Sequence, residues 1–201
     1  MKLRNARYLS HDFIDSLLQE GDIAVDATAG NGHDTLYLAQ KVGERGHVYA
    51  FDVQQAALDS TKERLAENGI PDECVTLILS GHERMADYVK EPVRCVLFNL
   101  GWLPSGDHSV TTRVPTTLAA VEAACGLLLP GGMVSVCVYP GHEEGTRELR
   151  ALEEALAGLD IREYNVLHGN FVNQRENAPQ SAGAAASCAR LSAKTVPSYL
   201  P

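Results

Sequence analysis

The sequence lacks a long hydrophobic run and an apolar leader, and both absences exclude classes of protein. No uninterrupted apolar stretch approaches the roughly 20 residues that a membrane span needs, and residues 1–10 carry charges in place of the apolar core of a signal peptide. We therefore expect a cytoplasmic protein that does not contact membranes. With 201 residues, of which 21% are charged and 45% hydrophobic, the chain is expected to form one globular domain.

Cysteine is too scarce, and too irregularly spaced, for a disulfide framework or a common zinc site. The number of cysteines is odd, and no two of them form a Cys-x-x-Cys pair. The five are Cys74, Cys95, Cys125, Cys137 and Cys188. Because Cys95 and Cys137 lie within apolar, strand-like segments, buried and unreactive thiols are the better interpretation, and we expect no metal site.

Positive charge is scarce as well, with 17 Lys and Arg residues against 26 Asp and Glu residues and a formal net charge of −9. Phosphate contacts usually dominate the affinity of a protein for nucleic acid, so this charge is unfavourable for such a partner without excluding it. Lys2, Arg4 and Arg7 cluster near the N-terminus and could form a local basic patch. The alternative is that these cations only keep a first helix solvated.

Strand-like and helix-like patterns alternate along the chain. Strands are predicted at residues 22–27, 47–52, 75–79, 93–100, 133–139 and 161–167. Helices are predicted at residues 8–18, 34–42, 54–68, 83–89, 116–129 and 143–159, with a loop at 101–115. This alternation favours an α/β fold with a doubly wound, mostly parallel sheet and helices on both faces. Ligands of such folds bind beyond the carboxyl ends of the strands.

A glycine loop follows the first predicted strand. Residues 26–35 read Asp-Ala-Thr-Ala-Gly-Asn-Gly-His-Asp-Thr, and Asp52 ends the second strand. A glycine turn between strand and helix, with an acid at the next strand end, is typical of a nucleotide-binding half-fold whose acid accepts the ribose hydroxyls. The residues expected to bind the cofactor are Asp26, Gly30, Asn31, Gly32, Asp34, Thr35, Asp52, Gln54, Gly81, His82 and Asn99.

Two classes of cofactor suit a Gly-x-Gly loop followed by an acid. A dinucleotide motif would have a third glycine, and the Asp34 carboxylate would repel a pyrophosphate that approaches the helix N-terminus. S-adenosylmethionine has no phosphate and presents an ammonium and a sulfonium, which Asp26 and Asp34 would attract. We therefore expect S-adenosylmethionine. The alternative is that Gly30 and Gly32 only form a tight turn and Asp34 only caps a helix.

The fourth strand end indicates the type of reaction. Its sequence, Asn99-Leu100-Gly101-Trp102, resembles the Asn-Pro-Pro-aromatic signature of amino-group methyltransferases, with Leu-Gly in place of Pro-Pro. The Asn99 amide oxygen and the Leu100 carbonyl could accept hydrogens of a target amine, while Trp102 stacks on a planar base. Alternatively, Trp102 is a packing anchor of the core.

Two further residues are candidates for the catalytic set. Asp107 and His142 lie on loops predicted at the same rim of the sheet. Either could relay the proton of the amine or bind a phosphate. Either could equally be a loop stabiliser, because Asp and His are common in turns.

Six motifs in order resemble one known family, the bacterial MnmM (YtqB-like) methyltransferases, long labelled rRNA methylases. The motifs lie at residues 26–35, 48–52, 61–65, 98–107, 139–145 and 171–174. The resemblance implies a Rossmann-like class I methyltransferase fold. It also implies methyl transfer from S-adenosylmethionine to the primary amine of 5-aminomethyl-2-thiouridine at the wobble position of tRNA, with the anticodon region as partner.

Several alternatives to this function stay open at the level of sequence. The chain could methylate an amine of a small molecule or of rRNA, and the acidic net charge would suit a small substrate. It could also be an inactive relative that binds adenosine or RNA without catalysing the reaction. The oligomeric state is not determined by the sequence, and a homodimer is compatible with it.

The C-terminal residues depart from the family pattern. After Asn177 and Pro179 the resemblance implies an apolar final strand, whereas residues 181–193 are almost all small. Such a composition is poor in side chains for an inner strand. We therefore expect a methyltransferase domain at residues 1–180, a missing or damaged final antiparallel strand that leaves a sheet edge open, and an atypical low-complexity tail at 181–201. A frameshift near codon 180 and a lineage-specific tail are alternative origins.

Overall fold

The computed structural model describes residues 5–101, 111–141, 143–171, 173 and 179–186. Several residues discussed above lie outside this set, namely Lys2, Arg4, Trp102, Asp107, His142 and Cys188. Among the residues described, no helix is both long and apolar enough to cross a lipid bilayer.

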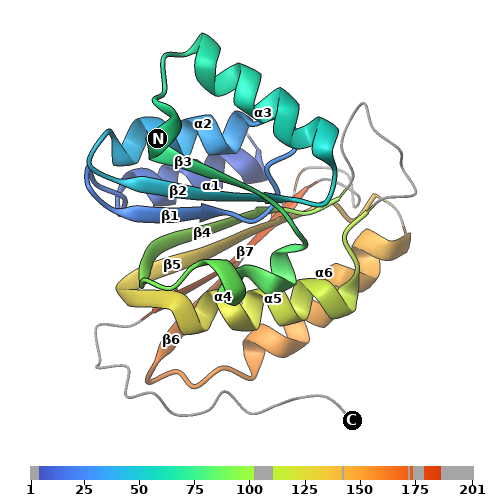
Figure 1. The fold of residues 1–201 in the computed structure, drawn as a ribbon. Helices are drawn as coiled ribbons and strands as arrows, with labels where there is room; N and C mark the ends of the chain where they lie inside the picture. Colours follow the sequence, from blue (N-terminus) through green and yellow to red (C-terminus); the bar gives the residue numbers. More distant parts are fainter. Residues whose placement is uncertain (1–4, 102–110, 142, 172, 174–178, 187–201) are drawn as a thin grey trace.

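A seven-stranded sheet with the order β3-β2-β1-β4-β5-β7-β6 forms the centre of the fold (Figure 1). The strands are β1 (Ile23–Asp26), β2 (His47–Asp52), β3 (Val75–Leu79), β4 (Val93–Asn99), β5 (Leu128–Val138), β6 (Tyr164–Gly169) and β7 (Gln180–Ala186). All pairings among β1 to β5 are parallel, whereas β7 runs antiparallel to both β5 and β6. The mostly parallel, doubly wound sheet predicted from the sequence is therefore confirmed.

Helices cover both faces of the sheet (Figure 1). They are α1 (Ala6–Asp15), α2 (His33–Val42), α3 (Gln55–Glu67), α4 (Met85–Tyr88), α5 (Val114–Leu127) and α6 (Glu143–Ala157), with short 3₁₀ turns η1 (Asp72–Cys74) and η2 (His82–Arg84). One buried cluster lies on the side of α1, α2 and α3. The other lies on the side of α4, α5 and α6.

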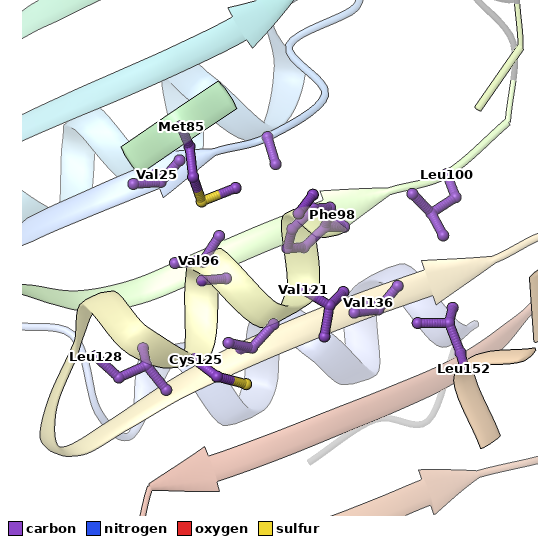
Figure 2. Close-up of a cluster of buried hydrophobic side chains, with 14 of the residues drawn as sticks. Val25, Met85, Val96, Phe98, Leu100, Val121, Cys125, Leu128, Val136 and Leu152 are labelled. Carbon is purple, nitrogen blue, oxygen red and sulfur yellow. The ribbon is translucent and has the colours of Figure 1, made fainter. Parts of the chain in front are cut away.

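The central strand β4 shows why the sheet is buried on both faces. Side chains of a strand alternate between the faces, and Cys95 and Leu97 belong to the cluster beneath α2 while Val96 and Phe98 belong to the cluster beneath α5. Figure 2 shows Val96 and Phe98 of β4 in one cluster with Val121 and Cys125 of α5. A continuous apolar run such as that of β4 is what a parallel strand covered on both sides requires.

Strand β7 corrects the expectation that the final antiparallel strand is missing. Its backbone pairs with β5 from Gln180 to Ala185 and with β6 from Ser181 to Ala186. Backbone N–H and C=O groups form the ladder whatever the size of the side chains, so a run of small residues can occupy an inner strand position. The sheet thus extends into residues that were assigned to the tail, and β7 covers the edge of β5 that was expected to lie open.

Smaller differences from the predicted elements have local causes. Strand β6 begins at Tyr164 instead of residue 161, because Asp160 first closes a turn in which its carboxylate accepts the N–H of Arg162 and its carbonyl accepts that of Tyr164. The segment predicted as a helix at 83–89 is divided into the turn η2 and the short helix α4. Strands β2 and β3 have the predicted bounds.

The cysteines that the structure describes are free and buried, namely Cys74, Cys95, Cys125 and Cys137. Burial raises the pKa of Cys95, Cys125 and Cys137 to about 12. A thiol with so high a pKa stays protonated near neutral pH and is a poor nucleophile. The interpretation of these four residues as buried, unreactive thiols is therefore confirmed.

Candidate functional site

A cavity of about 710 Å³ lies at the carboxyl ends of the parallel strands, where the fold class predicts a ligand. It is bounded by the segments that follow β1, β2, β3, β4 and β5. The predicted site residues that line it are Gly30, Asn31, Asp34, Asp52, Gln54, Gly81, His82, Asn99 and Leu100. The structure thus brings strand ends that are far apart in the sequence to one cavity.

The glycine loop is shaped by its contact with α3. Gly30 and Gly32 have φ angles of +53° and +74°, in the left-handed region that favours glycine. A Cβ atom on Gly32 would lie 2.7 Å from the Cα of Thr61 in α3, so the loop could not approach this helix with any larger residue. The Thr61 hydroxyl donates to the Gly30 carbonyl, and Arg64 Nε donates to the Asn31 carbonyl at 2.6 Å. Gly32 therefore shapes the loop without lining the cavity.

Asp52 is held in place by two backbone groups. Its Oδ2 accepts the N–H of Gly30 and its Oδ1 accepts the N–H of Gln54, both at 2.9 Å. A carboxylate offers about four lone-pair positions, so Asp52 can accept two further hydrogen bonds from a ligand in the cavity. A vicinal diol such as that of a ribose has the donors for this arrangement.

Asp26 and Thr35 do not line the cavity, although they were predicted to bind the cofactor. Both are fully buried, and the Thr35 hydroxyl donates to Asp26 Oδ2 at 2.6 Å. The other oxygen of Asp26 accepts the N–H of Thr28. Burial, with the negative charge of Asp34 as the next cause, raises the pKa of Asp26. These contacts support a role in holding the glycine loop from behind, instead of contact with a ligand.

Asp34, in the first turn of α2, accepts three hydrogen bonds from other elements. Its Oδ1 accepts from Arg7 Nε and from His11 Nε2, both at 2.8 Å, and its Oδ2 accepts from Asn99 Nδ2 at 3.3 Å. Burial opposes ionisation of Asp34, but the hydrogen bond from His11 and the charge of Arg7 outweigh it and lower the pKa. Asp34 is therefore an ionised carboxylate at neutral pH.

Helix α1 contributes to the site in a way that the sequence did not indicate. Arg7 was considered either as part of a basic patch or as a cation that solvates a first helix, but its guanidinium pairs with Asp34 at the wall of the cavity. His11, one helical turn further on, was not singled out at all. The spacing of Arg7 and His11 places both on one face of a helix, which is the only signal that the sequence offered for this pair.

Asn99 ends β4 with its side chain in a defined environment. Its backbone N–H donates to the Thr28 hydroxyl at 2.7 Å, and its side-chain nitrogen donates to Asp34. Its Oδ1 atom is buried and has no hydrogen-bond partner among the described residues. Buried polar atoms are almost always paired, so an unpaired acceptor at the wall of a cavity is a position for a donor of a ligand.

The loop after β3 adds a neutral histidine to the cavity. His82 is buried, and its Nδ1 donates to the Ala27 carbonyl at 3.2 Å. Burial lowers the pKa of His82. The ring packs edge-on against Phe98 at 5.7 Å between centroids. His82 thus forms a fixed, uncharged part of the wall.

The cavity is also lined by Thr111, Thr112, Arg113, Thr116 and Tyr139. Tyr139 begins the motif at residues 139–145, whereas the three threonines were not singled out in the sequence. The Thr112 hydroxyl accepts the N–H of Gly101 and donates to Glu148, a buried carboxylate of α6. Nothing in the local sequence connects residue 112 with residue 148, so this link required the tertiary structure. The predicted catalytic residues Trp102, Asp107 and His142 lie outside the described part of the chain.

Three relatives that resemble this chain in sequence are described as methylases or methyltransferases. The chain is 40% identical over 170 residues to the chloroplastic tRNA (mnm5s2U34)-methyltransferase of Arabidopsis thaliana, covering 80% of this chain but 62% of the length of that relative. A "putative rRNA-methylase" of Clostridium thermocellum superposes with a TM-score of 0.89 at 41% identity, covering 92% of this chain and all of that one.

A second solved structure extends this comparison. SMU.1697c of Streptococcus mutans, described as "a putative methyltransferase" and determined in complex with SAH, superposes with a TM-score of 0.83 at 36% identity, covering 92% of this chain and 99% of that one. The same Rossmann-like arrangement thus occurs in both solved relatives. Residues 48–183 match the model of the family described as "Putative rRNA methylase", and the chain therefore belongs to this family.

Proposed function

We propose that the chain is an S-adenosylmethionine-dependent N-methyltransferase of tRNA. Its acceptor is the primary amine of 5-aminomethyl-2-thiouridine at the wobble position, and its product is the methylaminomethyl derivative. The family and the similarity to the Arabidopsis tRNA methyltransferase support this proposal. The unpaired Asn99 oxygen at the cavity wall is the observation that carries it, because it supplies an acceptor for the hydrogens of an amine.

The cavity suits the adenosine part of S-adenosylmethionine. Asp52 presents free lone pairs for a ribose diol, and Gly30 and Gly81 line the same cavity. Asp34 occupies the first turn of α2, where a dinucleotide would place its pyrophosphate. The SAH bound by the Streptococcus mutans relative supports the same choice. When bound, S-adenosylmethionine supplies an electrophilic methyl group on a sulfonium.

The protein contributes to the transfer by holding the amine in line with that methyl group. Asn99 Oδ1 would accept one N–H of the amine and so direct its lone pair, which is catalysis by position. A free alkylamine resembles lysine, with a pKa of about 10.4, so it must lose a proton before it attacks. Leu100, Trp102, Asp107 and His142 are the further residues that we propose to contact the base or relay this proton.

The proposed partner is the anticodon region of tRNA. Lys2 and Arg4 stay candidates for phosphate contacts. Arg7 is less available, because its guanidinium already pairs with Asp34. The cytoplasmic location and a homodimer stay predictions.

Nucleoside mass spectrometry tests the proposal. The protein is incubated with methyl-labelled S-adenosylmethionine and tRNA that carries 5-aminomethyl-2-thiouridine, and the digested nucleosides are analysed. We expect one labelled methyl group on this nucleoside and none on tRNA that lacks the aminomethyl group. Asn99→Ala should reduce the incorporation by roughly tenfold or more. Binding of the cofactor without any incorporation into the aminomethyl tRNA would contradict the proposal.

Ribosomal RNA is the second candidate substrate, and the description of the family favours it. The same reaction carried out with ribosomal RNA in place of tRNA separates the two candidates. Labelled methyl groups in the ribosomal RNA alone would replace tRNA with rRNA as the substrate of the same cavity.

A further inference from the structure

Asp34 joins two parts of the site that the sequence does not connect. On one side it accepts from Arg7 and His11 of α1, and on the other side from the amide nitrogen of Asn99. It is 5% exposed, so all three contacts lie in a region of low dielectric. For the ammonium and sulfonium of the cofactor, which Asp26 and Asp34 were expected to attract, protein donors already occupy three of the roughly four lone-pair positions of Asp34.

The contact with Asp34 determines which end of the Asn99 amide faces the cavity. An amide has a donor end and an acceptor end that can exchange by a rotation about the last side-chain bond. An ionised carboxylate only accepts hydrogen bonds, so the Asn99 nitrogen must point toward Asp34 Oδ2. The Asn99 oxygen is then left on the other side, where it is buried and unpaired.

Helix α1 favours the ionised form of Asp34, which the orientation of the Asn99 amide requires. Arg7 and His11 stabilise the ionised carboxylate and lower its pKa. His11 is itself fixed, because its ring stacks on Tyr37 at 3.8 Å between centroids and 2° between planes. The Tyr37 hydroxyl lies within hydrogen-bond distance of the His11 carbonyl and of Asp15 Oδ1. Arg7, His11 and Tyr37 therefore form a rigid support for Asp34, which in turn favours one rotamer of Asn99.

We propose that Asp34 is a positioning residue, which acts through Asn99 by fixing the amide oxygen toward the acceptor amine, and that Arg7 and His11 support it. The inference rests on the proposed function, because it assigns the Asn99 oxygen to an amine. It replaces the direct contact between Asp34 and the cofactor that the sequence predicted.

Asp34→Asn is the first test, because it keeps the size of the side chain and inverts the amide of Asn99. Arg7 and His11 would hold the new amide by its oxygen, so its nitrogen would face Asn99. Asn99 must then turn its own oxygen toward residue 34 and its nitrogen toward the cavity. We expect kcat for methyl transfer to fall by roughly tenfold to a hundredfold, with the affinity for S-adenosylmethionine changed less than about threefold.

The exchanged pair, Asp34→Asn with Asn99→Asp, is the decisive variant. The carboxylate introduced at position 99 would accept from the amide nitrogen introduced at position 34 and would still present an oxygen to the cavity. We expect kcat of this double variant to be at least about tenfold higher than kcat of Asp34→Asn. Asn99→Asp alone places two carboxylates against each other and should be as impaired as Asp34→Asn. Such a recovery would show that residues 34 and 99 are coupled, because the effects of substitutions at two independent sites would simply add.

The wild type, the two single variants and the exchanged pair are compared by calorimetry of S-adenosylmethionine binding and by thermal unfolding. These two measurements separate a loss of kcat from misfolding. A loss of cofactor affinity in Asp34→Asn with unchanged kcat would overturn the inference in favour of direct contact with the cofactor. Failure of the exchanged pair to recover kcat, in a folded protein that binds the cofactor, would overturn it as well. If the wild-type protein binds the cofactor but methylates no amine, the proposed function has failed, and the inference fails with it.

Discussion

Asp52 is positioned before any ligand arrives, because two backbone N–H groups hold its carboxylate at the cavity wall. Hydrogen bonds to a charged group contribute about 1.5–3 kcal/mol each. We therefore predict that Asp52→Ala weakens S-adenosylmethionine binding roughly tenfold or more. Isothermal calorimetry measures this loss. Asp59→Ala, which removes an exposed carboxylate from the outer side of α3, is the control and should leave the affinity unchanged. Equal affinities of Asp52→Ala and wild type would remove Asp52 from the site.

Asp26 gives the stability of the protein a pH dependence of its own. Its pKa is raised in the folded state, so ionisation of Asp26 favours unfolding. The resulting loss of stability begins as the pH rises past the ordinary value for Asp and is complete once the pH exceeds the raised value. The amide introduced by Asp26→Asn never ionises and can still bond to Thr28 and Thr35. We predict that this variant melts at a higher temperature than wild type at pH 8, and that the difference shrinks toward pH 4. A difference that stays constant with pH would show that Asp26 does not titrate in this range.

At the scale of elements, the contact between the glycine loop and α3 limits what residue 32 can be. Both Gly32 and Gly69 have left-handed φ angles, of +74° and +70°, but only at Gly32 would a Cβ atom meet the backbone of another helix. The left-handed conformation alone costs alanine about 1–2 kcal/mol. We predict that Gly32→Ala lowers the free energy of unfolding by at least about 1 kcal/mol more than Gly69→Ala does. Urea unfolding measures both, and equal losses would mean that the loop does not rely on its contact with α3.

Local sequence patterns were sufficient to find the elements from α1 to β6, with small shifts in their bounds, and one side of the cavity. The glycine loop, Asp52 and Asn99 could be found because each follows an apolar strand, and the ends of parallel strands meet at one edge of the sheet. The partners of Asp34 could not be found in this way. Arg7 and His11 come from a helix that precedes the first strand, and its docking against β5, where the hydroxyls of Ser10 and Ser135 bond, has no short-range signal. The same holds for Thr112 and Glu148.

At the scale of the whole molecule, β7 is the strand that joins β6 to the rest of the sheet. Strand β6 is bonded only to β7 in the described sheet, so β7 connects it to the five parallel strands. The composition of residues 181–186 was misleading, because it describes side chains whereas the ladder depends on the backbone. We predict that amide protons of β7 exchange with solvent about as slowly as those of β5, as expected for an inner strand. Amide exchange measured by NMR decides this, and complete exchange of residues 181–186 within the dead time would contradict the topology.

All of the proposed chemistry depends on one arrangement, in which the cavity places an exocyclic amine against the methyl group of S-adenosylmethionine and the Asn99 oxygen accepts one hydrogen of that amine. Fragmentation of the labelled nucleoside in a tandem mass spectrometer tests this arrangement most directly, because it reveals which atom received the methyl group. We predict that all of the label is on the nitrogen of the aminomethyl substituent and leaves with it as labelled methylamine. Label on the ring, on the sulfur or on the ribose would contradict the arrangement.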